Sequence, residues 1–285
     1  MHTASPTPTD AIIDHLVHYV YQTATPSPKV LKVAKYCLWD SLSCALASLS
    51  EKDCLRMLGP IVPGTVVPNG VPVVGTKHRL DPIKAAFDMS AMIRWMDFND
   101  TSFAGGHPSD SIGAILAASY YQSQIRLQAG QPAHTIRDVL TGIVQAYEIQ
   151  GMLSFANKFD QASIGVDHVI GVKIACSSVL TKLLGGTPEQ AKAALGNSWM
   201  DGGTLNAYRH VPNAGPRKSW AGADAASRAL WHALHAIQGE PGYATPLSDP
   251  KWGFEKIFLN GKQVVIKDTL DSFVLENIIF KFYPC

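Results

Sequence analysis

Residues 94–110 read Arg94-Trp95-Met96-Asp97-Phe98-Asn99-Asp100-Thr101, followed by Ser102-Phe103-Ala104-Gly105-Gly106-His107-Pro108-Ser109-Asp110. One apolar helical pattern ends at about Met96 and another begins at about Ser109, so the stretch predicts a loop between two helices. Its two glycines let the backbone approach a ligand, and the helix that follows offers unpaired N–H groups to a carboxylate. The stretch therefore predicts a helical fold with a site on this loop.

Helical periodicity extends from this loop in both directions. Ser27-Pro28 and Asp81-Pro82 each combine an N-cap residue with a first-turn proline, which predicts helices over about 28–48 and 82–96. Thr187-Pro188-Glu189-Gln190 resembles a capping box and predicts a helix over about 188–199. Apolar stripes predict further helices over about 12–20, 109–124, 135–150, 167–184 and 216–238. We expect a mainly α fold.

Strand signals are confined to two parts of the chain. Residues 66–74 predict a short hairpin arm, and residues 257–259 and 264–266 flank Asn260-Gly261, a strong tight-turn signal. Residues 274–282 predict the start of another strand. Because short strands at a chain end do not form a stable sheet alone, either they belong to a second domain or they dock on the helical body.

Composition excludes several classes of protein. Nearly half of the residues (46%) are apolar and 16% are charged, which indicates a well-buried globular core. The formal net charge of +1 and the absence of a Lys/Arg run argue against nucleic-acid binding. No apolar run approaches the ~20 residues that a membrane span requires. The amino terminus resembles neither a signal peptide nor a mitochondrial presequence, so we expect a cytoplasmic protein, with the mitochondrion as the alternative in a eukaryote.

Neither the cysteines nor the paired histidines predict a metal site. The cysteines are Cys37, Cys44, Cys54, Cys176 and Cys285. Their irregular spacing predicts buried small hydrophobes in a reducing compartment and argues against an iron–sulfur cluster. His15/His18 and His232/His235 stand three apart on predicted helices, but neither pair has an evident third ligand. We therefore expect no metal and no cofactor.

Two histidines carry the acid/base chemistry that we expect. His107 lies on the same loop as Asp97; histidine titrates near neutrality, and an aspartate can set its tautomer. His168, in Gly165-Val166-Asp167-His168, lies in the first turn of a helix that Asp167 caps, where the helix dipole favours a neutral imidazole. The alternative is that the aspartates only cap helices and that both histidines are ordinary surface residues.

Positive charge gathers in the segment from Tyr208 to Trp220. It contains Arg209, His210, Arg217 and Lys218, interleaved with proline and glycine ahead of a helix. Arginine forks and lysine point charges are the usual ligands of carboxylates. A solvated basic loop is the alternative, but the interleaved prolines and glycines favour a shaped anion site.

Together these segments resemble the MmgE/PrpD family, and within it the 2-methylcitrate dehydratase branch. The matching strings are residues 94–101, 106–110, 165–169, 208–210 and 217–220, and residues 60–70 also resemble that branch. The similarity spans nearly the whole chain in consistent order. It implies a large all-helical domain over residues 1–255, a smaller α+β lid domain of which residues 256–285 are the incomplete beginning, and a homodimer with its site between the domains.

The resemblance also implies a reaction: loss of water from 2-methylcitrate, or a related 2-alkylcitrate, without a metal. In the related cis-aconitate decarboxylases the functional positions match Asp97, Thr101, His107, His168 and Lys218, and Lys281 resembles another. We expect one histidine to remove the proton next to a carboxylate, while the other group, with Asp97, protonates the departing hydroxyl. Thr101, Arg209, Lys218 and Lys281 are expected to bind the tricarboxylate substrate.

Two departures from the family pattern leave other functions open. The loop from Asp97 to His107 is about two residues shorter than in typical methylcitrate dehydratases and nearer the decarboxylase spacing. It therefore permits a longer alkylcitrate as substrate, or decarboxylation of a cis-aconitate-type acid. Family members continue beyond the position of Cys285, so a non-catalytic helical domain that only dimerises or binds ligand is the third hypothesis.

Overall fold

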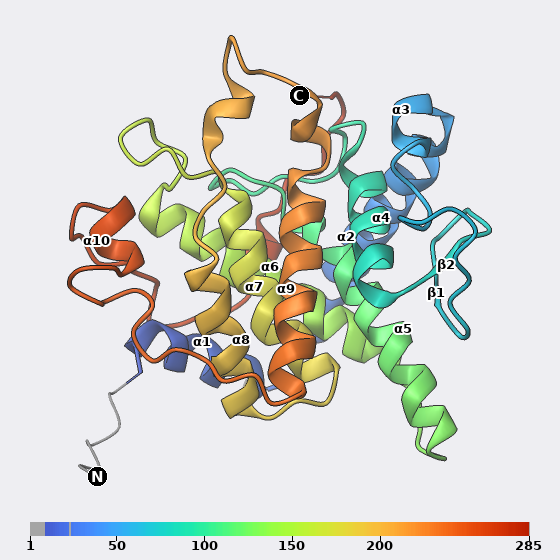
Figure 1. Ribbon diagram of the computed structural model, residues 1–285, viewed down its shortest axis with the longest axis horizontal. Helices are drawn as coiled ribbons and strands as arrows, with labels where there is room; N and C mark the ends of the chain where they lie inside the picture. The colour runs from blue at the N-terminus through green and yellow to red at the C-terminus, as the bar shows by residue number, and fades with distance from the viewer. Residues whose placement is uncertain (1–8, 23, 285) are drawn as a thin grey trace.

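Helices make up most of the computed structural model, which describes residues 9–22 and 24–284 (Figure 1). The longer helices are α1 (Ala11–Gln22), α2 (Pro28–Ala47), α4 (Pro82–Arg94), α5 (Ile112–Gln128), α6 (Ile136–Asn157), α7 (Val169–Leu183), α8 (Pro188–Met200) and α9 (Ala221–Ile237). The short ones are α3 (Lys52–Leu55), α10 (Phe254–Phe258) and α11 (Phe273–Glu276), with 3-10 turns η1 (Ser48–Ser50), η2 (Pro108–Ser111), η3 (Asn206–Arg209) and η4 (Pro216–Ser219). The predicted mainly α fold is confirmed. None of the helices described is long and apolar enough to cross a membrane.

The predicted helix starts are confirmed in their hydrogen bonds. The Ser27 hydroxyl and the Asp81 carboxylate both accept backbone N–H groups from the first turn of their helices, α2 and α4. Thr187 and Gln190 form the predicted capping box, each side chain bonding the other's backbone N–H at the start of α8. These contacts satisfy N–H groups that a helix end leaves unpaired.

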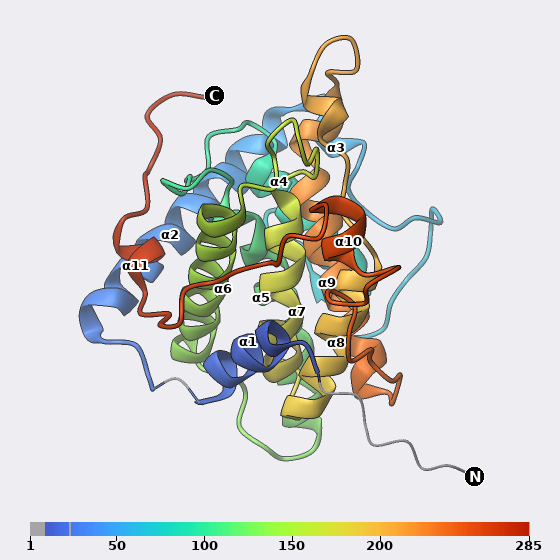
Figure 2. The same ribbon diagram turned by 90° about the vertical axis from the view of Figure 1, so that its left-hand side faces the viewer.

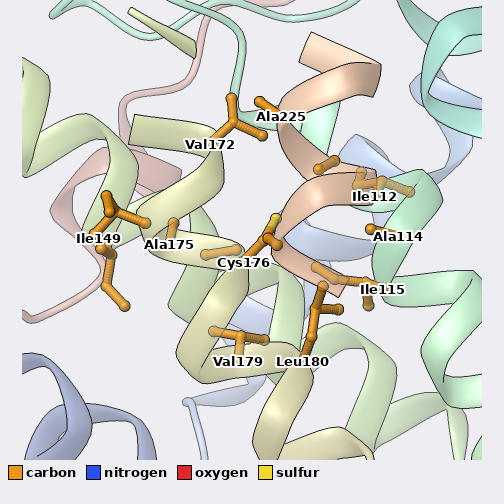
Figure 3. Packing of buried hydrophobic residues seen from close by; sticks show 14 of the residues in the cluster. Ile112, Ala114, Ile115, Ile149, Val172, Ala175, Cys176, Val179, Leu180 and Ala225 are labelled. Carbon is orange, nitrogen blue, oxygen red and sulfur yellow. The ribbon is translucent and has the colours of Figure 1, made fainter. Parts of the chain in front are cut away.

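Helix α7 is the centre of the core. Every residue of α7 except Lys182 is buried, and the helix packs against α6, α8 and α9. Figure 3 shows Val172 of α7 beside Ala225 of α9. Small side chains on α9 allow the helices to approach closely, as dense core packing requires.

The cysteines behave as the sequence predicts. Cys37, Cys44, Cys54 and Cys176 are buried free thiols, and burial raises the pKa of each. Cys285 lies outside the described residues.

The predicted hairpin arm is only partly right. Strand β1 (Val71–Pro72) pairs antiparallel with β2 (Arg79–Leu80), so its partner lies beyond residues 66–74. Pro68 has no N–H to donate to a neighbouring strand, and Asn69 adopts a positive φ of 58° that turns the chain. Val66 is consequently left 83% exposed and outside any strand.

The strands predicted near the carboxyl terminus are wrong. Residues 257–258 belong to helix α10, and Asn260 and Gly261, with φ of 59° and 83°, end it: the Gly261 N–H donates to the Glu255 carbonyl (2.9 Å). An Asn-Gly pair suits a helix C-cap as well as a hairpin. Val265, in the second predicted strand, pairs its backbone with the Asn157 side chain of α6 instead.

The third predicted strand, residues 274–282, is also not a strand. It begins as α11, which packs against α2 and α6 (Figure 2). Only Ile279 pairs in a strand-like manner, in an isolated bridge with Thr101. The segment thus docks on the helical body, the second of the two arrangements expected for these residues.

Candidate functional site

The loop between α4 and η2 is closed by its own hydrogen bonds. Asp97 adopts a left-handed conformation (φ 54°) that ends the helix, and Gly105 and Gly106 have φ of 85° and 77°. The Gly106 carbonyl accepts from the Ser102 N–H (3.1 Å) and from the Thr101 hydroxyl (3.0 Å). The two glycines supply the positive φ angles that this tight return needs.

Asp97 is the centre of a cluster of three cations. The Arg94 guanidinium donates to its carboxylate, the Lys281 ammonium lies 3.0 Å from Oδ1, and the Lys218 ammonium lies 2.7 Å from Oδ2. Burial would raise the pKa of Asp97, but the Arg94 charge and the hydrogen bonds from both lysines outweigh it and hold the pKa well below its usual range. Asp97 is therefore an ionised counter-ion for three segments that are distant in sequence.

His107 is oriented as a neutral base. Its Nδ1 lies 2.8 Å from the Asp100 carbonyl oxygen, which can only accept, so Nδ1 carries the proton. Nε2 is left with a lone pair and lies 3.8 Å from Asp97 Oδ1. Burial, and then the charges of Arg94 and Lys281, lower the pKa of His107 well below its usual value. The imidazole is uncharged at neutral pH.

His168 lies next to His107, with ring centroids 5.9 Å apart. His168 is itself the N-cap of α7, one residue later than predicted, so it precedes the first turn instead of lying in it; the Asp167 carboxylate still accepts the Val169 N–H (3.0 Å). Burial lowers the pKa of His168 to about 4, although the Asp167 charge opposes the shift. A Cβ placed on Gly106 would lie 3.0 Å from His168 Cδ2, so a glycine is needed for this close approach as well as for the turn.

Arg209 is bound to Asp167 rather than directed at the two imidazoles. Its guanidinium donates twice to that carboxylate, with Nη2 3.2 Å from Oδ1, and lies 5.0 Å from the centre of the Tyr208 ring. Arg217 stacks on the aromatic rings at both ends of the basic segment. Its guanidinium carbon lies 4.4 Å from the centre of the Trp220 ring and 5.6 Å from the centre of the Tyr208 ring. The basic segment is therefore shaped by stacking, as its prolines and glycines suggested.

A backbone bridge brings Lys281 to the site. The Thr101 N–H donates to the Ile279 carbonyl (2.9 Å), and the Ile279 N–H donates back to Thr101 (3.0 Å). Two residues later, the Lys281 side chain is only 5% exposed and also bonds the Asp97 carbonyl (3.1 Å). Of the strand predicted over residues 274–282, only the backbone pair between Thr101 and Ile279 forms, and this pair positions Lys281.

The structure thus gathers most of the predicted site residues in one place. Asp97, Thr101, His107, His168, Lys218 and Lys281 surround the loop, and Arg209 reaches it through Asp167. Whether they bind substrate or catalyse stays a prediction.

Sequence reasoning assigned no role to Arg94 and Asp110. Arg94 is 2% exposed, and its Nε lies 3.8 Å from Asp110 Oδ1. Burial raises the pKa of Asp110 to about 7, against the lowering effect of Arg94 and Arg209. The sequence did contain a signal for Arg94: a charged residue that interrupts the apolar face of a helix needs a buried partner of opposite charge.

Hollows lie elsewhere on the molecule. One of about 470 Å³ lies between α1 and α8 and includes His15 and His18, and one of about 580 Å³ is lined in part by Phe87 and Trp231. None of the predicted site residues lines either hollow. No three His, Cys, Asp or Glu residues in the described part of the chain are grouped as metal ligands. We place the site by its convergent, perturbed side chains rather than by hollow size.

Comparison with known proteins points to one family. Residues 14–267 match the sequence model of the MmgE/PrpD N-terminal domain. A 2-methylcitrate dehydratase of Escherichia coli (strain K12) is 45% identical over 274 residues, covering 95% of this chain and 56% of that protein. That of Cupriavidus necator is 44% identical (98% and 58% covered), and a mitochondrial one of Yarrowia lipolytica is 40% identical (96% and 53% covered). The chain spans a little over half the length of these relatives.

Proposed function

The chain belongs to the MmgE/PrpD family, and from that premise we propose that it is the helical part of a dehydratase that removes water from 2-methylcitrate or a related 2-alkylcitrate. One observation carries the proposal: two neutral imidazoles lie beside a carboxylate that is surrounded by three cations. The names of the relatives support the substrate class. Residues 256–285 as the start of a lid domain, the homodimer and the cytoplasmic location remain predictions.

The cations are suited to a polyanionic substrate. Lys218 is 43% exposed and pairs with Asp97, so a substrate carboxylate can take over this ammonium without a large rearrangement. Lys281 is buried on the other side of the same carboxylate. Removing a proton next to a carboxylate builds enolate charge, which fixed cations stabilise in a site that excludes water.

The two histidines divide the proton transfers. Nε2 of His107 has a lone pair and takes the proton from carbon, while the carbon–oxygen bond breaks and the departing hydroxide takes a proton from His168 to form water. A bound trianion adds negative charge beside His168 and raises its pKa from about 4, which favours the protonated acid. Asp97 is already ionised and does not supply this proton; its role is to position the lysines.

The first prediction is that His107→Ala and His168→Ala each lose about 10²–10⁴-fold in turnover, because each removes one proton-transfer group. The assay follows the absorbance of the new double bond from 2-methylcitrate, with protein made from the full reading frame of the gene. His235→Ala is the control, since His235 stacks on Trp231 (4.7 Å) on α9. Wild-type turnover in both site variants refutes the assignment, and release of CO₂ in place of water identifies a decarboxylase.

A further inference from the structure

Gln150 is a fully buried amide on α6 with no hydrogen-bond partner. Its exposed fraction is 0%, and neither its nitrogen nor its oxygen is hydrogen-bonded to any described residue. Gln145, on the same helix, is buried equally well (2%), but its amide donates to the Val20 carbonyl (2.9 Å). Because buried polar groups are nearly always paired, Gln150 needs a partner that the described residues do not supply.

The amide of Gln150 lies beside the same glycine as His168. A Cβ placed on Gly106 would lie 3.5 Å from Gln150 Nε2 and 3.0 Å from His168 Cδ2, so the amide and the imidazole are neighbours on one side of Gly106. His168 Nε2, bonded to that Cδ2, is likewise buried and unpaired. Ser154, one turn after Gln150, adds a third buried polar group, a hydroxyl with no partner among the described residues.

We propose that Gln150 is a positioning residue that, together with Ser154, holds one buried water molecule hydrogen-bonded to Nε2 of His168. Buried waters typically make about three hydrogen bonds to polar groups that would otherwise be unpaired. His168 Nδ1 lies 3.5 Å from the Asp167 carboxylate, which favours the proton on Nδ1. The water then donates to Nε2 and also bonds the Gln150 amide, and this selects a single tautomer of His168.

The test is the ¹⁵N NMR spectrum of the histidine side chains in the full chain. In the wild type we expect the His168 nitrogens to show one tautomer, with the proton on Nδ1. Gln150→Leu, which has similar volume but no amide, shifts both signals toward a tautomer mixture, whereas Gln145→Leu leaves them unchanged. Unchanged His168 signals in Gln150→Leu overturn the proposal.

A second set of variants guards against misfolding. Gln150→Met replaces the amide with a flexible chain of similar length, and we expect the same signal shift. Ser154→Ala shifts the signals in the same direction by a smaller amount. Should neither variant alter His168, the shared water does not exist.

The catalytic consequence rests on the proposed function, but the tautomer measurement does not. In the dehydration assay Gln150→Leu lowers kcat about tenfold with little change in KM. The variant loses the water that orients Nε2 of His168, the nitrogen that must take up a proton when substrate binds before His168 can act as the acid, and it leaves the cations unchanged. A wild-type protein without turnover refutes the dehydratase, whereas a normal kcat and normal tautomer in Gln150→Leu refute the role of Gln150.

Discussion

At the scale of single residues, the candidate site combines uncharged imidazoles with a high density of charge. His107 and His168 stay neutral because they are buried among cations, while Asp97 balances Arg94, Lys218 and Lys281. Both histidines were identifiable from sequence, because His107 shares a glycine-containing loop with Asp97 and His168 directly follows an aspartate at the start of a predicted helix. Gln150 was not, because nothing in an apolar helical pattern distinguishes a buried polar residue with a role from one on the surface.

Gly106 and its neighbour Gly105 allow a matched test of close approach. Both have positive φ (77° and 85°), so Gly105→Ala and Gly106→Ala each lose about 1 kcal/mol of unfolding free energy from backbone strain. Only the Cβ at Gly106 meets the His168 ring, since nothing lies within 4 Å of one at Gly105. We expect urea unfolding to show the larger loss for Gly106→Ala, and only that variant to perturb the His168 NMR signals. Equal effects of the two variants on His168 contradict the close approach.

At the scale of elements, the helix starts with a side-chain cap were predictable, whereas the strands and the exact starts of α5, α7 and α9 were not. The starts of α2, α4 and α8 carry their own chemical signals in Ser27, Asp81 and Thr187, whose side chains bond the helix they begin. The apolar segments after residue 256 carry only β propensity, which depends on a partner strand. In the structure α11 packs on helices α2 and α6, and Phe254 of α10 packs on Trp199 of α8, so the neighbours are helices and the segment forms α10, α11 and one isolated bridge.

The capping box of α8 allows a prediction at this scale. Thr187→Ala removes the side chain that accepts the Gln190 N–H, and we expect a loss of about 1 kcal/mol in unfolding free energy, measured by urea titration. Thr141→Ala on α6 is the control: its hydroxyl bonds only the Arg137 carbonyl one turn earlier, so its effect stays within about 0.5 kcal/mol. Equal losses in both variants are evidence against the capping contact.

At the scale of the whole molecule, two kinds of buried ionisable group change the stability of the fold in opposite directions as the pH changes. The folded pKa of His168 is lowered to about 4, so the unfolded chain binds the extra proton and stability is lost as pH falls from 6.5 toward 4. The folded pKa values of Asp100 and Asp110 are raised to about 6 and 7, so their contribution is lost as pH rises from about 4 toward those values. Between pH 4 and 7 the two effects partly cancel.

The variant Asp110→Asn separates the effect of the buried aspartates on the pH dependence of stability from the effect of His168. The asparagine amide has the same shape as the Asp110 carboxyl group but does not titrate. Residue 110 of the variant therefore no longer lowers the free energy of unfolding as the pH rises. We expect the melting temperature of the variant, relative to wild type, to rise steadily from pH 4 to pH 7 in scanning calorimetry. Asp249→Asn, at an exposed turn, is the control with a flat difference. A flat difference for Asp110→Asn means that Asp110 is already ionised in the folded protein.

The bridge between Thr101 and Ile279 has a consequence for biosynthesis. A ribosome releases all the long helices, and with them both imidazoles, well before it adds residues 279–281. Until then Asp97 lacks one of its ammonium neighbours and the loop at Thr101 lacks its backbone partner. The helical body of the nascent protein can therefore form before the cluster of cations around Asp97 is complete, and this cluster is assembled last.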